Sequence, residues 1–336
     1  MIISNFNTGE KVLVVAEIGN NHEGNFNKAV EMVHLAAESG ADAVKFQTIL
    51  AENFISIGNA SRIEQLKKYS FSLSQFVELS QVASKDGLIF LTTPFDIESV
   101  DAIYDMVPAY KISSGDNTFW PLIEHVARKN KPMIVSAGLA TVDELERSVE
   151  IVKKSSLTEN VKDKLAFLHC VCAYPAQQDD LNLNAIPFLK DRFNVEIGYS
   201  DHYCGIEACI AAVALGARII EKHFTYKKQG QQFRDHALSA DPKELKLMIS
   251  HIRKIEKMLG HKEKVILDIE KEGIENYRRS IAAKRDIPQG DRITMADITW
   301  LRPGTGLPPG KESLIIDCIA KRLIKKGEIF ILGEML

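Results

Sequence analysis

The sequence predicts an α/β fold in which a (β/α)8 barrel is followed by a small β-rich domain. Over about 250 residues, apolar runs of strand length alternate strictly with stretches of helical spacing, and there are eight of each. After Leu259 the chain is charged and weakly periodic, and from Arg278 onward it consists of short β-like runs punctuated by Gly and Pro. A doubly wound open sheet is the alternative, but no G-x-G-x-x-G follows the first strand.

The elements follow one another in a regular order. We expect strands at 12–18, 43–47, 88–92, 109–112, 132–136, 165–170, 195–199 and 218–223. We expect helices at 26–39, 73–86, 97–106, 119–129, 142–154, 183–192, 206–215 and 242–259. Continuous apolar runs such as VLVVAEI suit strands buried on both faces. Residues 49–72 form a longer, mixed insertion between the second strand and its helix.

Three segments follow from this pattern. We expect a catalytic barrel over 1–262, a charged and weakly periodic linker over 263–277, and a compact domain over 278–336. A domain of roughly 60 residues is small but can fold, especially where it docks on another surface.

Composition narrows the class of protein. A net charge of −3 gives no sign of a nucleic-acid binder. No apolar run approaches the roughly 20 residues of a membrane span, and the N-terminus lacks signal-peptide architecture. Five cysteines without a CxxC pair favour a reducing compartment, so we expect a cytoplasmic protein. Cys170 and Cys172 could form a thiolate metal site, but we expect their sulfurs on opposite faces of a strand.

Two histidines follow apolar runs near the end of the predicted barrel. His202 comes just after the strand 195–199, and His223 ends the strand 218–223. Parallel strands joined by one helix usually lie side by side, so both imidazoles would sit at the same end of neighbouring strands. There they could share one metal ion, with Asp235 following in a polar loop. The alternative is two buried histidines that each hydrogen-bond a neighbour.

Lysines and hydroxyl groups gather at other strand ends. Lys45 and Lys111 lie within apolar strands, where a cation is costly to bury unless it meets an anion. Thr93, the turn 113–115 and Ser136 add hydroxyl and amide donors, which together suit a phosphate or carboxylate. Either lysine alone would be explained by a chain that snorkels to water. Glu17 is the candidate general acid or base, or else an ion-pair partner for a lysine.

Seven motifs together resemble one family, the sialic acid synthases. They are EIGNNHEG (17–24), TPFD (93–96), YKISSGD (110–116), SAGLAT (136–141), LHCVCAYP (168–175), GYSDHYCGIEA (198–208) and EKHFT (221–225). The segments RSIAAKRDIPQGDRIT and LRPGTG resemble the antifreeze-like (SAF) domain that follows the barrel in these enzymes. The resemblance implies a transferase that condenses phosphoenolpyruvate with an N-acylated amino sugar and releases phosphate.

The resemblance also implies roles for single residues. His202 and His223 would hold a divalent metal, Mn²⁺ by resemblance, with Mg²⁺ and Co²⁺ as alternatives. The residues that would bind phosphoenolpyruvate are Lys45, Thr93, Lys111, Ser114 and Ser136, and Glu17 would be a catalytic carboxylate beside Lys45 and Lys111. The sugar would contact Asn59, Tyr174 and Asp235, and Arg302 would reach the sugar of the other subunit in a domain-swapped homodimer.

The product is less well defined than the reaction. We expect N-acetylneuraminate first, with legionaminate or pseudaminate as the alternative. Asp116 stands where the sialate-forming bacterial pattern has Glu, Cys172 where it has Asn, and Ala137 where it has a hydroxyl residue. These departures leave the identity of the sugar open. More distant alternatives are a keto-deoxy-sugar phosphate synthase, which would need a second basic phosphate site and would have no use for the tail that carries Arg302, and a non-catalytic sugar- or ice-binding protein. The binding protein would not need the strand-end lysines, the carboxylate and the histidines.

Overall fold

The computed structural model describes residues 1–156 and 160–333, which form two compact units, Met1–Gly260 and His261–Leu336. The first unit is built on eight parallel strands: β3 (Leu13–Gly19), β4 (Ala43–Thr48), β5 (Ile89–Pro94), β6 (Tyr110–Ile112), β7 (Met133–Ser136), β8 (Leu165–Cys170), β9 (Glu196–Asp201) and β10 (Ile219–His223). The strand order is β5-β4-β3-β10-β9-β8-β7-β6. The first and last of these strands, β3 and β10, are paired, and β5 contacts β6, so the predicted barrel is confirmed.

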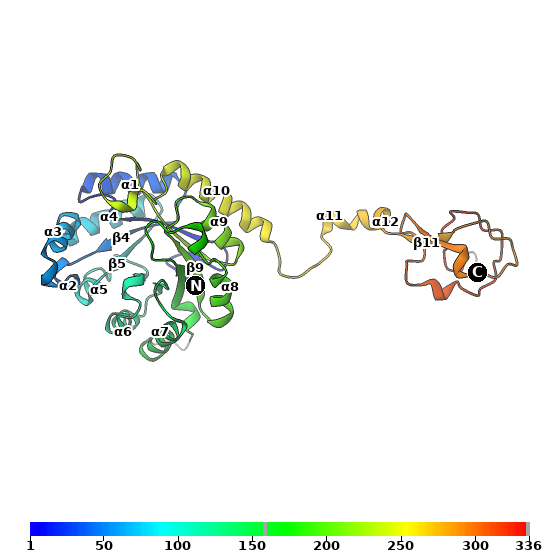
Figure 1. Ribbon diagram of the computed structural model, residues 1–336, viewed down its shortest axis with the longest axis horizontal. Helices are drawn as coiled ribbons and strands as arrows, with labels where there is room; N and C mark the ends of the chain where they lie inside the picture. Colours follow the sequence, from blue (N-terminus) through cyan, green and yellow to red (C-terminus); the bar gives the residue numbers. More distant parts are fainter. Residues whose placement is uncertain (157–159, 334–336) are drawn as a thin grey trace. The chain divides into compact units, whose positions relative to one another are not determined.

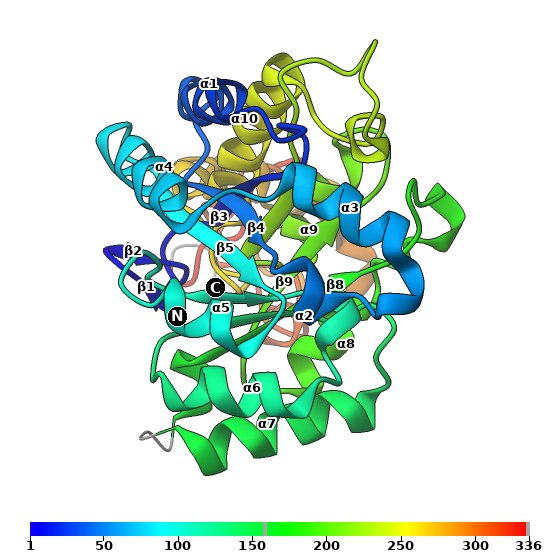
Figure 2. The same ribbon diagram turned by 90° about the vertical axis from the view of Figure 1, so that its left-hand side faces the viewer.

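Helices surround this sheet in the first unit (Figures 1 and 2). They are α1 (Phe26–Glu38), α4 (Leu73–Lys85), α5 (Ile97–Ala102), α6 (Trp120–Arg128), α7 (Val142–Ser155), α8 (Ala185–Arg192), α9 (Glu207–Ala214) and α10 (Pro242–Leu259). Side-chain caps start several of them, as at Thr141 before α7 and Asp241 before α10. The helix α5 ends four residues before the predicted end, and tight turns follow it, in which the N–H of Tyr104 donates to the carbonyl oxygen of Asp101 and that of Met106 to Ile103. The insertion forms α2 (Ala51–Phe54) and α3 (Ala60–Tyr69).

Side chains alternate between the two faces of each strand. On β3, Val14, Ala16 and Ile18 pack outward against the helices in the main hydrophobic core. Leu13 and Val15 point inward and belong to a second core inside the barrel. The same inward set continues to Glu17, which is where the barrel interior changes from apolar to polar.

A short N-terminal hairpin closes the apolar end of the barrel. It consists of β1 (Ile2–Ile3) and β2 (Phe6–Asn7), which pair antiparallel. Met1 and Ile3 are buried in the inner core beside the inward residues of the strands. We did not predict this hairpin, because two-residue strands leave no periodic pattern in a sequence.

The second unit has a small core of its own. After α11 (Asp268–Lys271) and α12 (Gly273–Tyr277), β11 (Ser280–Ala283) pairs antiparallel with β12 (Ile298–Leu301). Single β-bridges join later segments of the chain to this unit, as between Ala282 and Ile329. Buried aliphatic residues and Phe330 form the hydrophobic core of the unit. Among the described residues, no helix combines the length and apolar character that a membrane span requires.

Candidate active site

The polar end of the barrel interior holds a cavity of about 340 Å³. Ten of the residues predicted from the sequence line it: Glu17, Lys45, Thr93, Lys111, Ser114, Ser136, Tyr174, His202, His223 and Asp235. They come from inward-facing positions on the strands or from the loops that follow them. The carboxyl ends of parallel barrel strands are where active sites form, so this cavity is the candidate site.

One side of the cavity is an ion cluster around Lys45. Its Nζ lies 2.7 Å from Glu17 Oε2 and 3.8 Å from Glu221 Oε1, and it donates to Thr93 Oγ1 at 3.1 Å. The side chains of all three charged residues are almost completely buried. Lys45 is therefore held inside the barrel by two carboxylates rather than by a path to water.

Lys111 belongs to the same cluster. Its Nζ donates to Ser136 Oγ at 2.6 Å and lies 3.7 Å from Glu221 Oε1. Glu221 also accepts from Ser200 Oγ at 3.1 Å, so one carboxylate faces both lysines. We did not predict Glu221 or Ser200 as site residues. The signal was present, because Glu221 lies two residues before His223 on the same strand face.

Burial and charge shift the pKa values of this cluster in different directions. Burial raises the pKa of Glu17 from 4.5 to about 7, although Lys45 opposes the rise. Burial also lowers the pKa of Lys111. For Lys45 and Glu221 the charges outweigh burial, so the pKa of Lys45 is raised and that of Glu221 is lowered. Glu17 is thus the member of the cluster that can exchange a proton near neutral pH.

The two histidines face each other across neighbouring strand ends. Their ring centroids are 5.3 Å apart. His202 Nδ1 lies 2.7 Å from the carbonyl oxygen of Val171, which leaves its Nε2 available. His223 Nδ1 is buried without a hydrogen-bond partner in the described part of the chain, and burial lowers the pKa of both rings. Two neutral imidazoles with an unpartnered nitrogen fit a divalent metal.

The protein supplies few other metal ligands. Within 1–156 and 160–333, no group of three or more His, Cys, Asp or Glu side chains is arranged to hold a metal. The nearest acid is Asp235, whose Oδ2 lies 3.9 Å from His223 Nδ1. A metal bound by the two histidines would therefore keep positions for water or substrate oxygen, as catalytic sites do.

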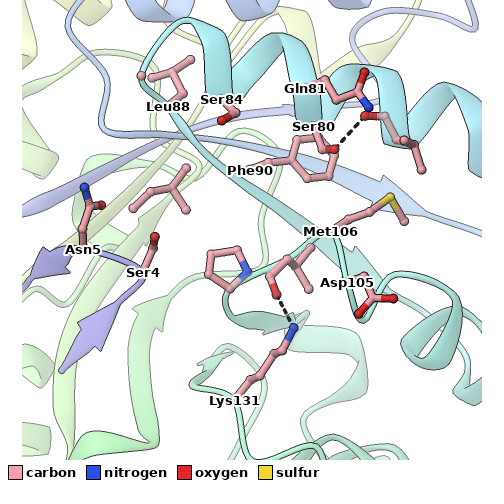
Figure 3. A pocket seen from close by; sticks show the side chains of 15 residues that line it. Ser4, Asn5, Ser80, Gln81, Ser84, Leu88, Phe90, Asp105, Met106 and Lys131 are labelled. Carbon is pink, nitrogen blue, oxygen red and sulfur yellow. Dashed lines mark hydrogen bonds between the residues drawn. The ribbon is translucent and has the colours of Figure 1, made fainter.

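A larger cavity lies at the other end of the strands. It measures about 760 Å³ and is lined by the hairpin loop, α4 and the residues that precede β5, β6 and β7 (Figure 3). Its titratable side chains are Asp105 and Lys131, and Lys131 donates to the carbonyl oxygen of Val107. Without a convergent set of reactive groups, this cavity is a weaker candidate than the polar one.

Comparison with known proteins decides the family. Residues 32–264 match the NeuB family, and residues 278–330 match the SAF domain. The chain belongs to the NeuB family. The resemblance read from the motifs, the SAF domain and the class of enzyme are thereby confirmed.

Named relatives of this NeuB family member cover nearly the whole chain. An uncharacterized protein of Methanocaldococcus jannaschii is 41% identical over 98% of this chain and 96% of its own length. The N,N'-diacetyllegionaminic acid synthase of Campylobacter jejuni is 36% identical over 95% of this chain and 99% of its own. The crystal structure of N-acetylneuraminic acid synthetase from Leptospira borgpetersenii, in complex with citrate, has a TM-score of 0.76 and 35% identity, covering 82% of this chain and 95% of that one.

Asn59, one of the predicted sugar contacts, does not line the cavity. Asn59 is exposed and caps α3, where its side chain accepts from the backbone N–H of Arg62. Arg62, which we did not predict, lines the cavity in its place. Arg302 belongs to the second unit of this NeuB family member, and its role stays a prediction.

The expectation for the two cysteines was wrong. Residues two apart on a strand share a face, and both Cys170 and Cys172 line the cavity. A hydrogen bond with Cys170 lowers the pKa of Cys172 to about 6, while the pKa of Cys170 is raised. A Cβ at Gly138 would lie 2.6 Å from Cys172 Sγ, so the Gly makes room for this thiol.

Arg234 is a further lining residue that we did not predict. Arg234 places its guanidinium 4.7 Å from the centroid of Tyr174, and its Nε lies 3.2 Å from Asp235 Oδ1. The Tyr174 ring is 4.0 Å from that of His202. Arg234 could not be predicted from the spacing of strand residues, because it lies in the long loop after β10.

Proposed function

We propose that this protein condenses phosphoenolpyruvate with the open-chain aldehyde of an N-acylated amino sugar to give a nine-carbon sialic-type acid and phosphate. One observation carries the proposal: Lys45 and Lys111 meet His202 and His223 in one buried cavity. An anionic substrate and a carbonyl compound polarised by a metal need these two kinds of group side by side. Membership of the NeuB family supports the same reaction.

The lysines would bind the anionic substrate. Lys45 and Lys111 neutralise its phosphate and carboxylate, and the hydroxyl groups of Thr93 and Ser136 already lie against them. Ser114 Oγ is buried beside the thiols of Cys170 and Cys172, and its hydroxyl group can turn to donate to an incoming oxygen. Every donor of this cradle lies on a strand or in the turn after one, which holds the cradle rigid.

The remaining residues would act on the carbonyl and on water. C3 of the enol attacks the aldehyde carbon, water adds at C2, and phosphate leaves with cleavage of its C–O bond. His202 and His223 would hold a divalent metal, for which Mn²⁺ is the first candidate. When bound, this metal would supply Lewis-acid polarisation of the aldehyde oxygen. Glu17, with its pKa near 7, accepts the proton that the attacking water loses.

The acceptor that the motifs predict is N-acetylmannosamine. A diacetamido-trideoxy-hexose is the second candidate, and one side of the cavity favours it. That side is apolar and is formed by Ile49, Phe54, Leu66 and Phe95. A 6-deoxy sugar presents a methyl group, which gains about 0.8 kcal/mol when it is buried against such a surface. The Campylobacter relative is named for a diacetylated product, which agrees with this candidate.

The second unit would complete the site of another copy. We propose that the linker 263–277 carries the SAF domain to a partner subunit, so that the partner subunit's Arg302 contacts the acyl group of the sugar. A homodimer with exchanged tails is the arrangement that the family resemblance implies. Arg302 lies within the matched SAF range, in the segment LRPGTG.

Phosphate release tests the reaction directly. Purified protein with Mn²⁺ and phosphoenolpyruvate should release phosphate only when an acceptor is present. The panel contains N-acetylmannosamine, its diacetamido-trideoxy analogue and the corresponding altrose analogue. His223→Ala should lose this activity and bind less metal while remaining folded. Absence of release with every acceptor would reject the proposal in favour of a binding protein.

A further inference from the structure

An ion pair lies directly behind the two histidines, on the outer face of the strands. Lys222 Nζ is 2.7 Å from Asp201 Oδ2, and the two side chains are 1% and 0% exposed. The two residues are register partners on β10 and β9. Each one also immediately precedes a histidine of the site, Asp201 before His202 and Lys222 before His223.

The Asp201 carboxylate accepts a full set of hydrogen bonds. Tyr199 Oη donates to Oδ1 at 2.8 Å, and the backbone N–H of Tyr203 donates to the same oxygen at 3.0 Å. Cys209 Sγ, on α9, lies 3.4 Å from Oδ2. Lys222 also donates to the carbonyl oxygen of Tyr203. The network therefore joins β9, β10, the loop after β9 and the covering helix at one point.

Stability alone does not account for a pair of this kind. Moving two charges into an apolar interior is costly, and apolar replacements of similar volume often leave a protein as stable or more stable. Both residues face the packed helix layer rather than the cavity, since they alternate with the inward side chains. They therefore touch no substrate, and their effect on the site passes through the backbone.

We propose that Lys222 and Asp201 are positioning residues that set the spacing of His202 and His223 and thereby the affinity for the metal. The inference rests on the proposed metal role of these histidines. Because the pair links the residues just before each histidine, a loss of the pair lets β9 and β10 shift relative to each other. A shift of a few tenths of an ångström changes how well two imidazoles share one ion.

The test is the affinity of the full-length, metal-stripped protein for Mn²⁺ alone, measured by the electron paramagnetic resonance of free Mn²⁺. Lys222→Met and Asp201→Asn should each raise the dissociation constant about 10- to 100-fold. Tyr199→Phe, which removes one donor to Asp201, should give a smaller rise. Thermal unfolding of each metal-free variant reports whether its fold is intact.

The double variant Asp201→Asn/Lys222→Met separates positioning from stability. It leaves no unpaired charge, so it should unfold close to the wild-type temperature yet still bind Mn²⁺ about 10-fold more weakly. Asp42→Asn is the matched control, because Asp42 pairs with Arg253 of α10 at the opposite end of the barrel and accepts from the Val14 N–H at 2.9 Å. It should lower stability and leave Mn²⁺ affinity unchanged.

Two results would overturn the inference. If the double variant binds Mn²⁺ as tightly as the wild type, the pair has no positioning role, although the metal site stands. If Asp42→Asn weakens binding equally, the effect is general loosening of the barrel. His223→Ala tests the underlying assignment separately: when wild type and His223→Ala bind Mn²⁺ alike, the metal role of the histidines fails, and the inference fails with it.

Discussion

At the scale of single residues, two lysines and two carboxylates with almost completely buried side chains line one cavity. Glu221 faces both lysines and its pKa is lowered, so it is the ionised partner. Glu17 contacts Lys45 at 2.7 Å, yet burial raises its pKa to about 7. An anionic substrate that draws the lysines toward itself would weaken the pairing of Glu17 and leave it free to act as a base.

The raised pKa of Glu17 predicts how stability depends on pH. The unfolded chain loses this proton near pH 4.5 and the folded chain near 7, so the folded state binds more protons between these values. Its contribution to the free energy of unfolding is complete below about pH 4.5 and is lost as pH rises to about 7. Urea unfolding of metal-free protein across this range should show the decline.

Glu17→Gln should remove that part of the slope. The variant should therefore gain stability relative to the wild type as pH rises. Glu38→Gln, at the exposed end of α1, should keep the wild-type slope. Parallel curves for wild type and Glu17→Gln would show that the carboxyl of Glu17 titrates alike in both states.

Replacement of Lys111 should weaken the binding of phosphoenolpyruvate. Lys111→Met removes a buried cation that contacts Ser136, while Glu221 keeps Lys45 as a partner. We expect a loss of about 2 kcal/mol or more in binding free energy, roughly a 30-fold rise in Kd by calorimetry. Lys131→Met is the control, because Lys131 lines the other cavity. Equal Kd values for both variants would argue against the cradle.

At the scale of elements, the loop between β10 and α10 brings groups to the cavity that no strand carries. Glu23, in the loop after β3, accepts from the backbone N–H groups of Gln232 and Phe233 at 2.9 and 2.8 Å. The next residues, Arg234 and Asp235, line the cavity. One carboxylate therefore ties the loop of the first strand to the loop of the last.

Glu23→Ala should loosen this loop and weaken sugar binding. We expect the KM of the sugar to rise on the order of 10-fold, because small displacements of positioning groups are costly. The Kd of phosphoenolpyruvate, which binds to strand ends, should stay within about twofold of the wild type. Glu38→Ala provides the control at an exposed acid. A matching rise for both substrates would mean that the loop supports the whole barrel mouth.

The strands and helices of the barrel could be predicted because the spacing of their apolar residues follows from which faces are buried. Strands buried on both faces are continuous apolar runs, and helices buried on one face repeat apolar residues at helical spacing. Site residues on strands, such as Lys45 and His223, could be predicted for the same reason. Glu221 could have been found by stepping two residues back from His223, and the same step puts Cys170 and Cys172 on one face. Arg62 and Arg234 could not, since loops and insertions follow no period. Nor could the N-terminal hairpin, which is recognised only by the inner core that it closes.

At the scale of the whole molecule, the chain consists of two units with separate cores. The proposed exchange of SAF domains makes a specific claim about which chain supplies Arg302. Arg302→Ala should raise the KM of the sugar well above any change for phosphoenolpyruvate, because its contact is with the acyl group. Equal changes in both constants would reject that contact.

Mixed dimers distinguish exchange between chains from a contact within one chain. Lys111→Met and Arg302→Ala each disable a site, one in the barrel and one in the SAF domain. In an exchanged heterodimer, the barrel with intact Lys111 receives the partner subunit's Arg302, so one of the two sites should be complete. Two differently tagged variants, co-expressed and purified through both tags, should then recover about half of the wild-type kcat per dimer. If each chain used its own Arg302, both sites would remain defective and the heterodimer would be no more active than the better of its parents.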